Sequence, residues 1–169
     1  CVLEWYNPQT GNGYPYSVPS HGVLFIEIPS DEVYNNQMGG KDDKGILVSS
    51  TDVISLYIAN EANNSFDAAN VLPVTALGCS YMIQTGKSIG EAGSTYPGLN
   101  RASFLVVATQ DGTRVRITPS CLTYDGHVAN DPYEIELNRG ECYHVLNKNP
   151  GGAGNSDGDF TGTWVESLD

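Results

Sequence analysis

The chain has 169 residues, of which 40% are hydrophobic, so it can bury the core of one domain and is not expected to be globally disordered. Its 20 acidic residues outnumber 8 basic ones, and the formal charge is −12. A surface of this sign repels duplex nucleic acid and anionic bilayers, so neither is expected as a main partner. No apolar run approaches the roughly 20 residues that span a bilayer, so membrane insertion is not expected either.

Strand patterns recur along the whole chain, whereas no window keeps apolar residues at helical spacing for three turns. In chain order the strand-like segments are "CVLEWY" (1–6), "GVLFIEIP" (22–29), "VISLYIAN" (53–60), "ANVLPV" (69–74), "SYMIQT" (80–85), "SFLVVAT" (103–109), "TRVRITP" (113–119), "YEIELNRG" (133–140) and "ECYHVLN" (141–147). About ten short strands with regular turn signals predict an all-β fold, an antiparallel β-sandwich or barrel-like sheets. We expect helix in less than about a tenth of the residues.

Two of these segments predict specific pairings. Segment 103–109 is apolar throughout, which is typical of a central strand buried on both faces. The dipeptide Asp111-Gly112 supplies the positive φ of a tight turn, so it predicts a hairpin between 103–109 and 113–119. If 113–119 also pairs with 133–137, two arginines face two glutamates on the solvent side and fix the register. These residues are Arg114, Arg116, Glu134 and Glu136.

Three polar, glycine-rich stretches are predicted loops, at residues 7–22, 34–45 and 147–162. Aromatic residues gather around the first of them. Exposed aromatic rings can bind sugars, but tyrosines in a loop rich in Pro and Gly also pack over sheet edges, and both interpretations stay open. These aromatic residues are Trp5, Tyr6, Tyr14 and Tyr16.

The chain contains four cysteines, none of them in a zinc-binding pattern. An even number favours one or two disulfides in an exported protein, and buried free thiols are the alternative. The pairing among them is left open. The cysteines are Cys1, Cys79, Cys121 and Cys142.

Two further motifs are candidate sites. Asn155, Asp157 and Asp159 alternate in a glycine-rich stretch, with Glu166 farther along, and such oxygen ligands suit calcium. An acidic, solubilising turn is the alternative, because Phe160 stands where a calcium loop requires glycine. The "NNS" motif makes Asn63 a candidate for N-glycosylation.

Signatures of enzymes are missing. The stretch "TGKS" (85–88) lacks the preceding glycine of a phosphate-binding loop, and the three histidines lie in separate segments. No nucleophile elbow or zinc-protease motif occurs. We therefore expect a non-catalytic protein without a cofactor, calcium excepted; a glycan hydrolase with two scattered carboxylates is a weaker alternative.

The order of several motifs is similar to that of a known family. The stretches "VLPVTALGCSY", "ATQDGTRVRITPS" and "LNRGECYHVL" lead to "DFTGTWVESLD". Together they resemble the IgGFc-binding protein N-terminal domain family over residues 22–169. Members occur in a mucus glycoprotein of animals and in bacterial surface or secreted proteins.

The resemblance also implies a division of the chain. Residues 1–21 form an N-terminal strand and loop, 22–161 the family's β domain, and 162–169 the truncated start of a second half. Within the chain, "GILVSSTD" (45–52) and "GTWVESLD" (162–169) share Gly, Val, Ser and Asp at the same places, which fits a two-half repeat.

We therefore expect an extracellular binding or adhesion module, secreted or at the cell surface, that recognises a glycoprotein or glycan. The alternative is a structural building block of an extracellular filament or coat, in which copies of the protein meet at sheet edges. Binding of IgG Fc does not follow from a family name alone.

Overall fold

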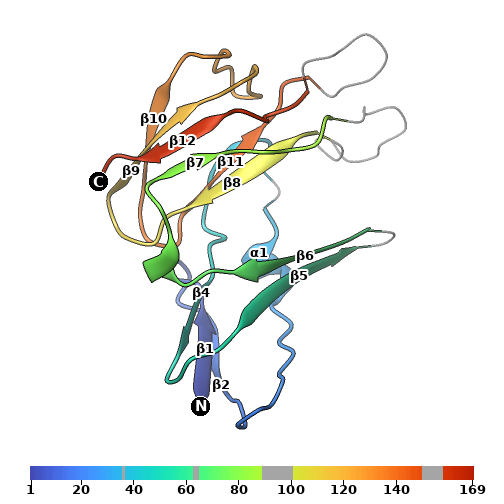
Figure 1. Ribbon diagram of the computed structural model, residues 1–169, viewed down its shortest axis with the longest axis vertical. Coiled ribbons are helices and arrows are strands. Elements are labelled where there is room, and N and C mark those ends of the chain that lie inside the picture. Colours follow the sequence, from blue (N-terminus) through green and yellow to red (C-terminus); the bar gives the residue numbers. More distant parts are fainter. Residues whose placement is uncertain (36, 63–64, 89–100, 150–157) are drawn as a thin grey trace.

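The computed structural model describes residues 1–35, 37–62, 65–88, 101–149 and 158–169. It confirms the predicted fold class: 41% of the residues are in strands and 5% in helices, the sheets are antiparallel, and they do not close into a barrel. Figure 1 shows an elongated molecule, with a sandwich of two sheets at one end and the N-terminal strands at the other.

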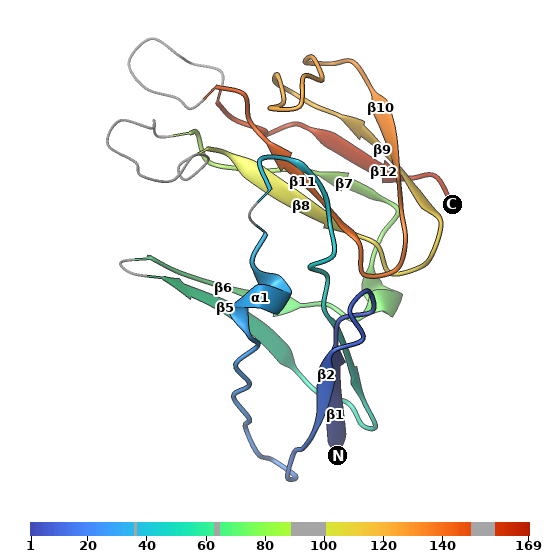
Figure 2. The same ribbon diagram turned by 180° about the vertical axis from the view of Figure 1, so that it is seen from behind.

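The sandwich consists of two sheets that pack face to face (Figure 2). One has the order β10-β9-β12-β7 and the other the order β3-β11-β8. The first sheet comprises β7 (Ser80–Met82), β9 (Thr113–Thr118), β10 (Tyr133–Leu137) and β12 (Trp164–Ser167). The second comprises β3 (Gly40–Asp42), β8 (Ser103–Val107) and β11 (Cys142–Leu146).

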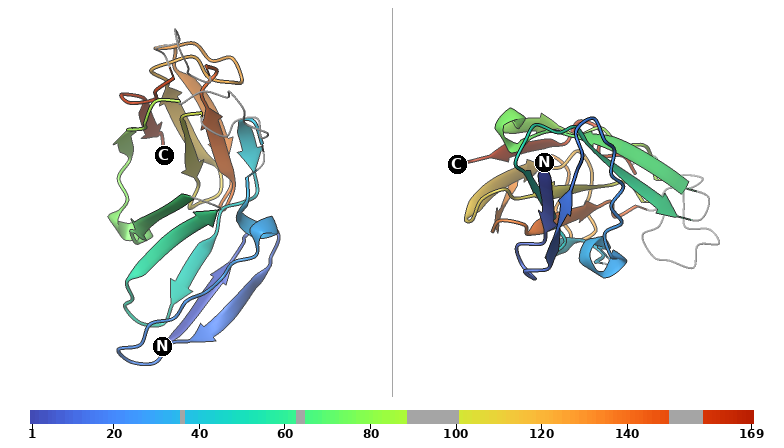
Figure 3. Two further views of the ribbon diagram at one scale, coloured as in Figure 1. Left: turned by 90° about the vertical axis from the view of Figure 1, so that its right-hand side faces the viewer. Right: turned by 90° about the horizontal axis from the view of Figure 1, so that it is seen from below.

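The remaining elements lie at the N-terminal end, as the side view in Figure 3 shows. A third sheet has the order β2-β1-β4, and β5 and β6 form a two-stranded sheet of their own. The strands are β1 (Val2–Tyr6), β2 (Gly13–Ser17), β4 (Leu47–Ser50), β5 (Leu56–Ala62) and β6 (Ser65–Val71). The helical residues are α1 (Ser30–Val33) and the 3-10 turn η1 (Val74–Ala76).

The core follows from alternation along the strands. In β9, Val115 and Ile117 are buried, whereas Arg114 is exposed and Arg116 half-buried. Phe160 is fully buried and packs edge-on against Phe104 of the opposite sheet, with 5.2 Å between the ring centroids. A clean alternation of this kind identifies a strand with one face on the core and the other toward water.

The predicted register between β9 and β10 is confirmed. Arg116 lies opposite Glu134 and forms an ion pair with it at 2.9 Å, and Arg114 lies opposite Glu136. All four side chains are at least partly exposed, so these pairs fix register more than they add stability.

The predicted hairpin between 103–109 and 113–119 is wrong. β8 pairs with β11, and β9 lies in the other sheet. Gly112 has the expected positive φ of 69°, but the turn carries the chain across the sandwich instead of back along the same sheet. Nor is β8 buried on both faces: it is an edge strand with Leu105 and Val107 about half exposed. A turn signal specifies local backbone geometry and leaves the partner strand undecided.

Two of the predicted loops contain strands, and one predicted strand has no partner. β2 lies within 7–22 and β3 within 34–45. Pro15 is tolerated in β2 because this strand is at a sheet edge, where its missing N–H is not needed. Conversely, residues 22–29 are not part of any sheet in the structure.

The four cysteines are unpaired, so the expected disulfides are absent from the structure. Cys121 and Cys142 are instead the buried thiols of the alternative interpretation. Cys121 accepts a hydrogen bond from the Asn147 side chain, and Cys142 donates to the carbonyl of Asp42, so the two sulfurs have separate partners. Burial raises the pKa of both thiols, which keeps them protonated and poorly reactive.

A buried carboxylate attaches α1 to the loop after β1. Glu32 accepts hydrogen bonds from the side chains of Asn12, Thr10 and Asn7. The hydrogen bond from Asn12, followed by those from Thr10 and Asn7, holds the pKa of Glu32 below its usual range. The charged form is therefore the form that stabilises this contact.

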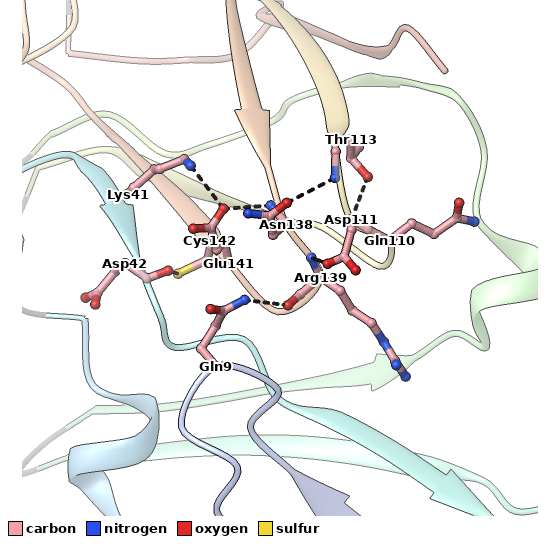
Figure 4. Close-up of polar contacts among 11 residues, drawn as sticks. Gln9, Lys41, Asp42, Gln110, Asp111, Thr113, Asn138, Arg139, Glu141 and Cys142 are labelled. Carbon is pink, nitrogen blue, oxygen red and sulfur yellow. Dashed lines mark hydrogen bonds and ion pairs between the residues drawn. The ribbon is translucent and has the colours of Figure 1, made fainter.

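A tight turn between β10 and β11 joins the N-terminal end to the sandwich (Figure 4). At its centre, the Gly140 N–H donates to the carbonyl of Ala108, and its carbonyl accepts from the N–H of Gly45. Gly140 has a φ of 81°, and a Cβ on it would lie 2.6 Å from the ring of Pro8. Only glycine satisfies both constraints.

We predict that Glu32→Gln makes the protein less stable at pH 7 but has a smaller effect in acid. Because the folded-state pKa of Glu32 is lowered, its contribution is complete above the ordinary value of about 4.3 and is lost as pH falls below it. Urea midpoints at pH 7 and pH 3 measure this. The control is Glu61→Gln, an exposed change of equal charge, which should leave the midpoints in place. An unchanged gap between Glu32→Gln and the wild-type protein at both pH values would contradict the prediction.

We also predict that Gly140→Ala is more destabilising than Gly112→Ala. Both glycines have positive φ, but only Gly140 lacks room for a Cβ. Gly112→Ala should lower the free energy of unfolding by about 1 kcal/mol through backbone strain. Gly140→Ala should lose at least about 1 kcal/mol more, because Pro8 must move. Equal losses in urea denaturation would show that the turn accommodates the methyl group.

Candidate functional site

An open hollow lies where the β2-β1-β4 sheet meets the turn between β10 and β11. Its volume is about 470 Å³. It is lined by Glu4, Tyr6, Gly11, Gly13, Ser49 and Arg139. The hollow therefore draws residues from both ends of the molecule.

The alternation of β1 builds one wall of the hollow. Leu3 and Trp5 are buried beneath the sheet, so Glu4 and Tyr6 face outward. Gly13 lies opposite Tyr6 in β2, where a Cβ would come within 2.4 Å of the Tyr6 Cβ. The glycine lets the two strands pair closely beside the tyrosine.

Arg139 forms the other side, and its backbone is held firmly. Its N–H donates to Asp111 Oδ1 at 3.0 Å, and its carbonyl accepts from Gln9 Nε2 at 2.8 Å, as Figure 4 shows. The guanidinium lies 5.6 Å from the centroid of the Tyr6 ring, within the range of a cation–π contact. The exposed side chain thus projects from a fixed backbone.

The hollow offers a ring, a cation, a carboxylate and a hydroxyl group within one small area. Arg and Tyr dominate the energetics of many protein interfaces, and aromatic rings with nearby hydrogen-bonding groups suit sugars. Among the aromatic residues singled out in the sequence, only Tyr6 lines this hollow. Trp5 is 2% exposed and packs against Tyr14, with 5.7 Å between the ring centroids.

A second polar cluster lies in the segment between β9 and β10. Asp125 accepts hydrogen bonds from Thr123 Oγ1 and, at 2.6 Å, from the Tyr143 hydroxyl. His127 stacks on Tyr133, with 3.5 Å between the centroids. Burial raises the pKa values of both tyrosines, so their hydroxyl groups stay protonated. The Thr123 hydroxyl also accepts a hydrogen bond from the His127 N–H at 2.8 Å, and the cluster fastens this segment to β10 and β11.

The calcium and glycosylation candidates are only partly within the described residues. Asp159 is half-buried, and its Oδ1 accepts from Thr85 Oγ1 and from the N–H and hydroxyl of Thr161. The backbone N–H and then the hydroxyl of Thr161 hold the pKa of Asp159 below its usual range. Asn155, Asp157 and Asn63 lie outside the described residues. The calcium site and the glycosylation site therefore stay predictions.

Among the residues that the structure describes, no group of three or more His, Cys, Asp or Glu side chains could hold a metal ion. No helix that these described residues form has the length and apolar character needed to cross a membrane.

Sequence reasoning missed Arg139 and the hollow. Arg139 stands next to Gly140 in "NRGE", so a cation beside an obligatory turn glycine was the available signal. Its contact with Tyr6 joins residues from opposite ends of the chain, which no local pattern reveals.

Comparison with known proteins confirms the resemblance noted in the sequence, but over a shorter range than residues 22–169. The profile of the family described as "IgGFc binding protein" matches residues 67–169, which is more than half of the chain and runs from β6 through β12. No curated protein and no solved structure matches the chain. The strands β7 to β12 that form most of the sandwich are thus the matched part, and the chain belongs to the IgGFc-binding protein family.

Proposed function

We propose that this chain is a non-catalytic binding module of a secreted or cell-surface protein, and that it recognises a glycoprotein or glycan partner. The hollow around Tyr6 and Arg139 carries this proposal. Family membership supports a binding role, because the family is one of binding domains.

The electrostatics of the hollow favour a partner with hydroxyl or acidic groups. The chain carries a formal charge of −12 and only 8 basic residues, so an exposed arginine in a hollow is a rare cation on an acidic surface. Glu4 and Ser49 add acceptors and a donor at the same place. The Tyr6 ring provides an apolar face for a sugar ring or a partner side chain.

Immunoglobulin Fc is a suitable test ligand for this binding role. The matching family is named for binding IgG Fc, and Fc is a glycoprotein. Fc with and without its glycan therefore tests protein recognition and glycan recognition with one reagent.

A second candidate function is a structural block of an extracellular assembly. β7 and β8 are sheet edges with exposed apolar side chains, and β5 and β6 pair only with each other among the described strands. Bare edges of this kind are templates for association. Light scattering at rising protein concentration distinguishes the two candidates, because only the structural block should form larger assemblies without a partner.

We predict that Tyr6→Ala and Arg139→Ala each weaken binding by about 10-fold or more, which corresponds to about 1.4 kcal/mol. Tyr6→Phe should bind almost as well as the wild-type protein, because it keeps the ring beside Arg139. The assay is biolayer interferometry against native Fc, deglycosylated Fc and a glycan array.

Tyr57→Ala is the matched control, since Tyr57 is 72% exposed on β5 and does not line the hollow. Binding that falls equally in Tyr57→Ala and Tyr6→Ala would remove the hollow from the proposal. Circular dichroism and urea denaturation of each variant separate a lost contact from a lost fold.

A further inference from the structure

The same strand arrangement occurs twice in this chain. β1 and β4 pair in the register in which β9 and β12 pair: Trp5 lies opposite Val48, as Ile117 lies opposite Val165. Every pair of the β1–β4 ladder has its equivalent in the β9–β12 ladder under one fixed shift for each strand. β4 and β12 also form the central part of the repeated Gly-Val-Ser-Asp pattern, which spans residues 45–52 and 162–169.

The next strand repeats as well. Tyr14 of β2 lies opposite Trp5, and Tyr133 of β10 lies opposite Ile117. When β2 is aligned with β10 so that Tyr14 matches Tyr133, the pairs between β2 and β1 match the pairs between β10 and β9. One constant offset in residue number is enough for all the pairs that occur in both ladders.

The turn that follows this strand is the same in both places. In the second copy, Gly140 has a φ of 81°, and the Glu141 N–H donates to the Asn138 carbonyl at 2.9 Å. In the first copy, His21 has a φ of 57° at the equivalent position, and the Gly22 N–H donates to the Pro19 carbonyl at 3.0 Å. A histidine with positive φ is uncommon, so this agreement is not a general property of turns.

The alignment that matches the two turns also matches residues 23–27 with β11. The two copies differ here, because β11 is a strand in a sheet and residues 23–27 are not. β11 lies between β3 and β8, with Cys142 and Val145 each 2% exposed. Residues 23–27 make no hydrogen bond within the described part of the chain, and Val23 and Phe25 are 80% and 93% exposed. Figures 1 and 2 show this segment, between β2 and α1, as a single coil apart from the sheets.

We propose that residues 1–52 are the closing half of a fold unit whose complete form is residues 53–169. In this unit, residues 23–27 are an acceptor edge for a strand of the β8 type, that is, for a copy of Ser103–Val107. In this arrangement residues 162–169 form the end of a unit and not the start of the next one.

Two of the gaps in the first copy point to the same occupant. Among the described strands, residues 23–27 lack the equivalents of both β8 and β3, and β4, which pairs with β1 alone, lacks the equivalent of β7 on its other side. In the complete unit, β12 has both neighbours, and β7 and β8 both lie within residues 53–112. One copy of residues 53–112 therefore supplies the missing equivalents of β7 and β8.

The complete unit also gives the register. His144 of β11 lies opposite Leu105, and Leu146 lies opposite Ser103. The same register places Phe25 opposite the Leu105 equivalent and Glu27 opposite the Ser103 equivalent. The Arg101 equivalent then lies two residues from the position facing Glu27, on the diagonal where a long cationic side chain reaches a carboxylate. The same register places Leu24 and Ile26 opposite the equivalents of the inward Val106 and Phe104. Pairing of the unpaired backbone of 23–27 and burial of these two side chains supply the driving force.

The test attaches a second copy of residues 53–112 directly to Cys1 of the full chain. This connection reproduces the natural step from Gly112 to Thr113, because Cys1 aligns with Thr113 when β1 is placed on β9. Amide hydrogen exchange is then compared between the 169-residue chain and the extended chain. We expect the amides of residues 23–27 to gain at least about 10-fold protection, and those of β4 to gain protection with them.

The control is the same extension with Phe104→Asp and Val106→Asp in the added copy only, which places charges at the half-buried, inward positions of the added strand. This control should leave residues 23–27 unprotected while the original residues 53–169 remain folded. Equal exchange of residues 23–27 in all three proteins would overturn the proposal. Protection that depends on protein concentration in the unextended chain, with a dimer in light scattering, would also overturn it, because the edge would then serve a second copy of the chain.

Discussion

The turn at Gly140 holds the two ends of the molecule together. Its N–H bonds to Ala108 at the end of β8, its carbonyl bonds to Gly45 ahead of β4, and the ring of Pro8 occupies the place where any other residue would put a Cβ. Three segments that are distant in sequence are therefore in contact through one backbone unit. Because the two ends of the molecule meet here, the shape of the hollow and the position of Arg139 in its lining depend on the conformation of this turn.

The proposed binding role rests on how the turn and β1 are combined. Strand alternation sends Trp5 inward and Tyr6 outward, and the fixed backbone at Arg139 holds a cation against the exposed ring. The chain carries a formal charge of −12, so an exposed arginine differs in sign from most of the charged surface. Family membership over residues 67–169 agrees with a binding module.

The exposure of Val23 and Phe25 is explained if the chain contains one complete and one incomplete unit, because the strands that would pair with their segment are then missing. An apolar segment such as 23–27, with Phe25 at 93% exposure, is costly in water unless other strands pair with it. The equivalent strand β11 is buried because β8 pairs with one side of it and β3, which comes from residues 1–52, pairs with the other. The difference between the two copies thus lies in their neighbours and not in their backbone pattern, which is the same through the turn at His21 and Gly140.

The fold class, the register of β9 with β10 and the family could each be predicted from the sequence, because they rest on local alternation, opposite charges at matching positions, or motif order. Three-dimensional packing was needed to show that β8 and β9 lie in different sheets, that β2 is a strand despite Pro15, and that the cysteines are unpaired. The contact between Arg139 and Tyr6 likewise became visible only in the folded chain. The physical reason is the same in each case: a turn dipeptide or a cysteine count fixes local chemistry, whereas the partner of a strand, a sulfur or a cation is chosen by packing between residues far apart in the chain.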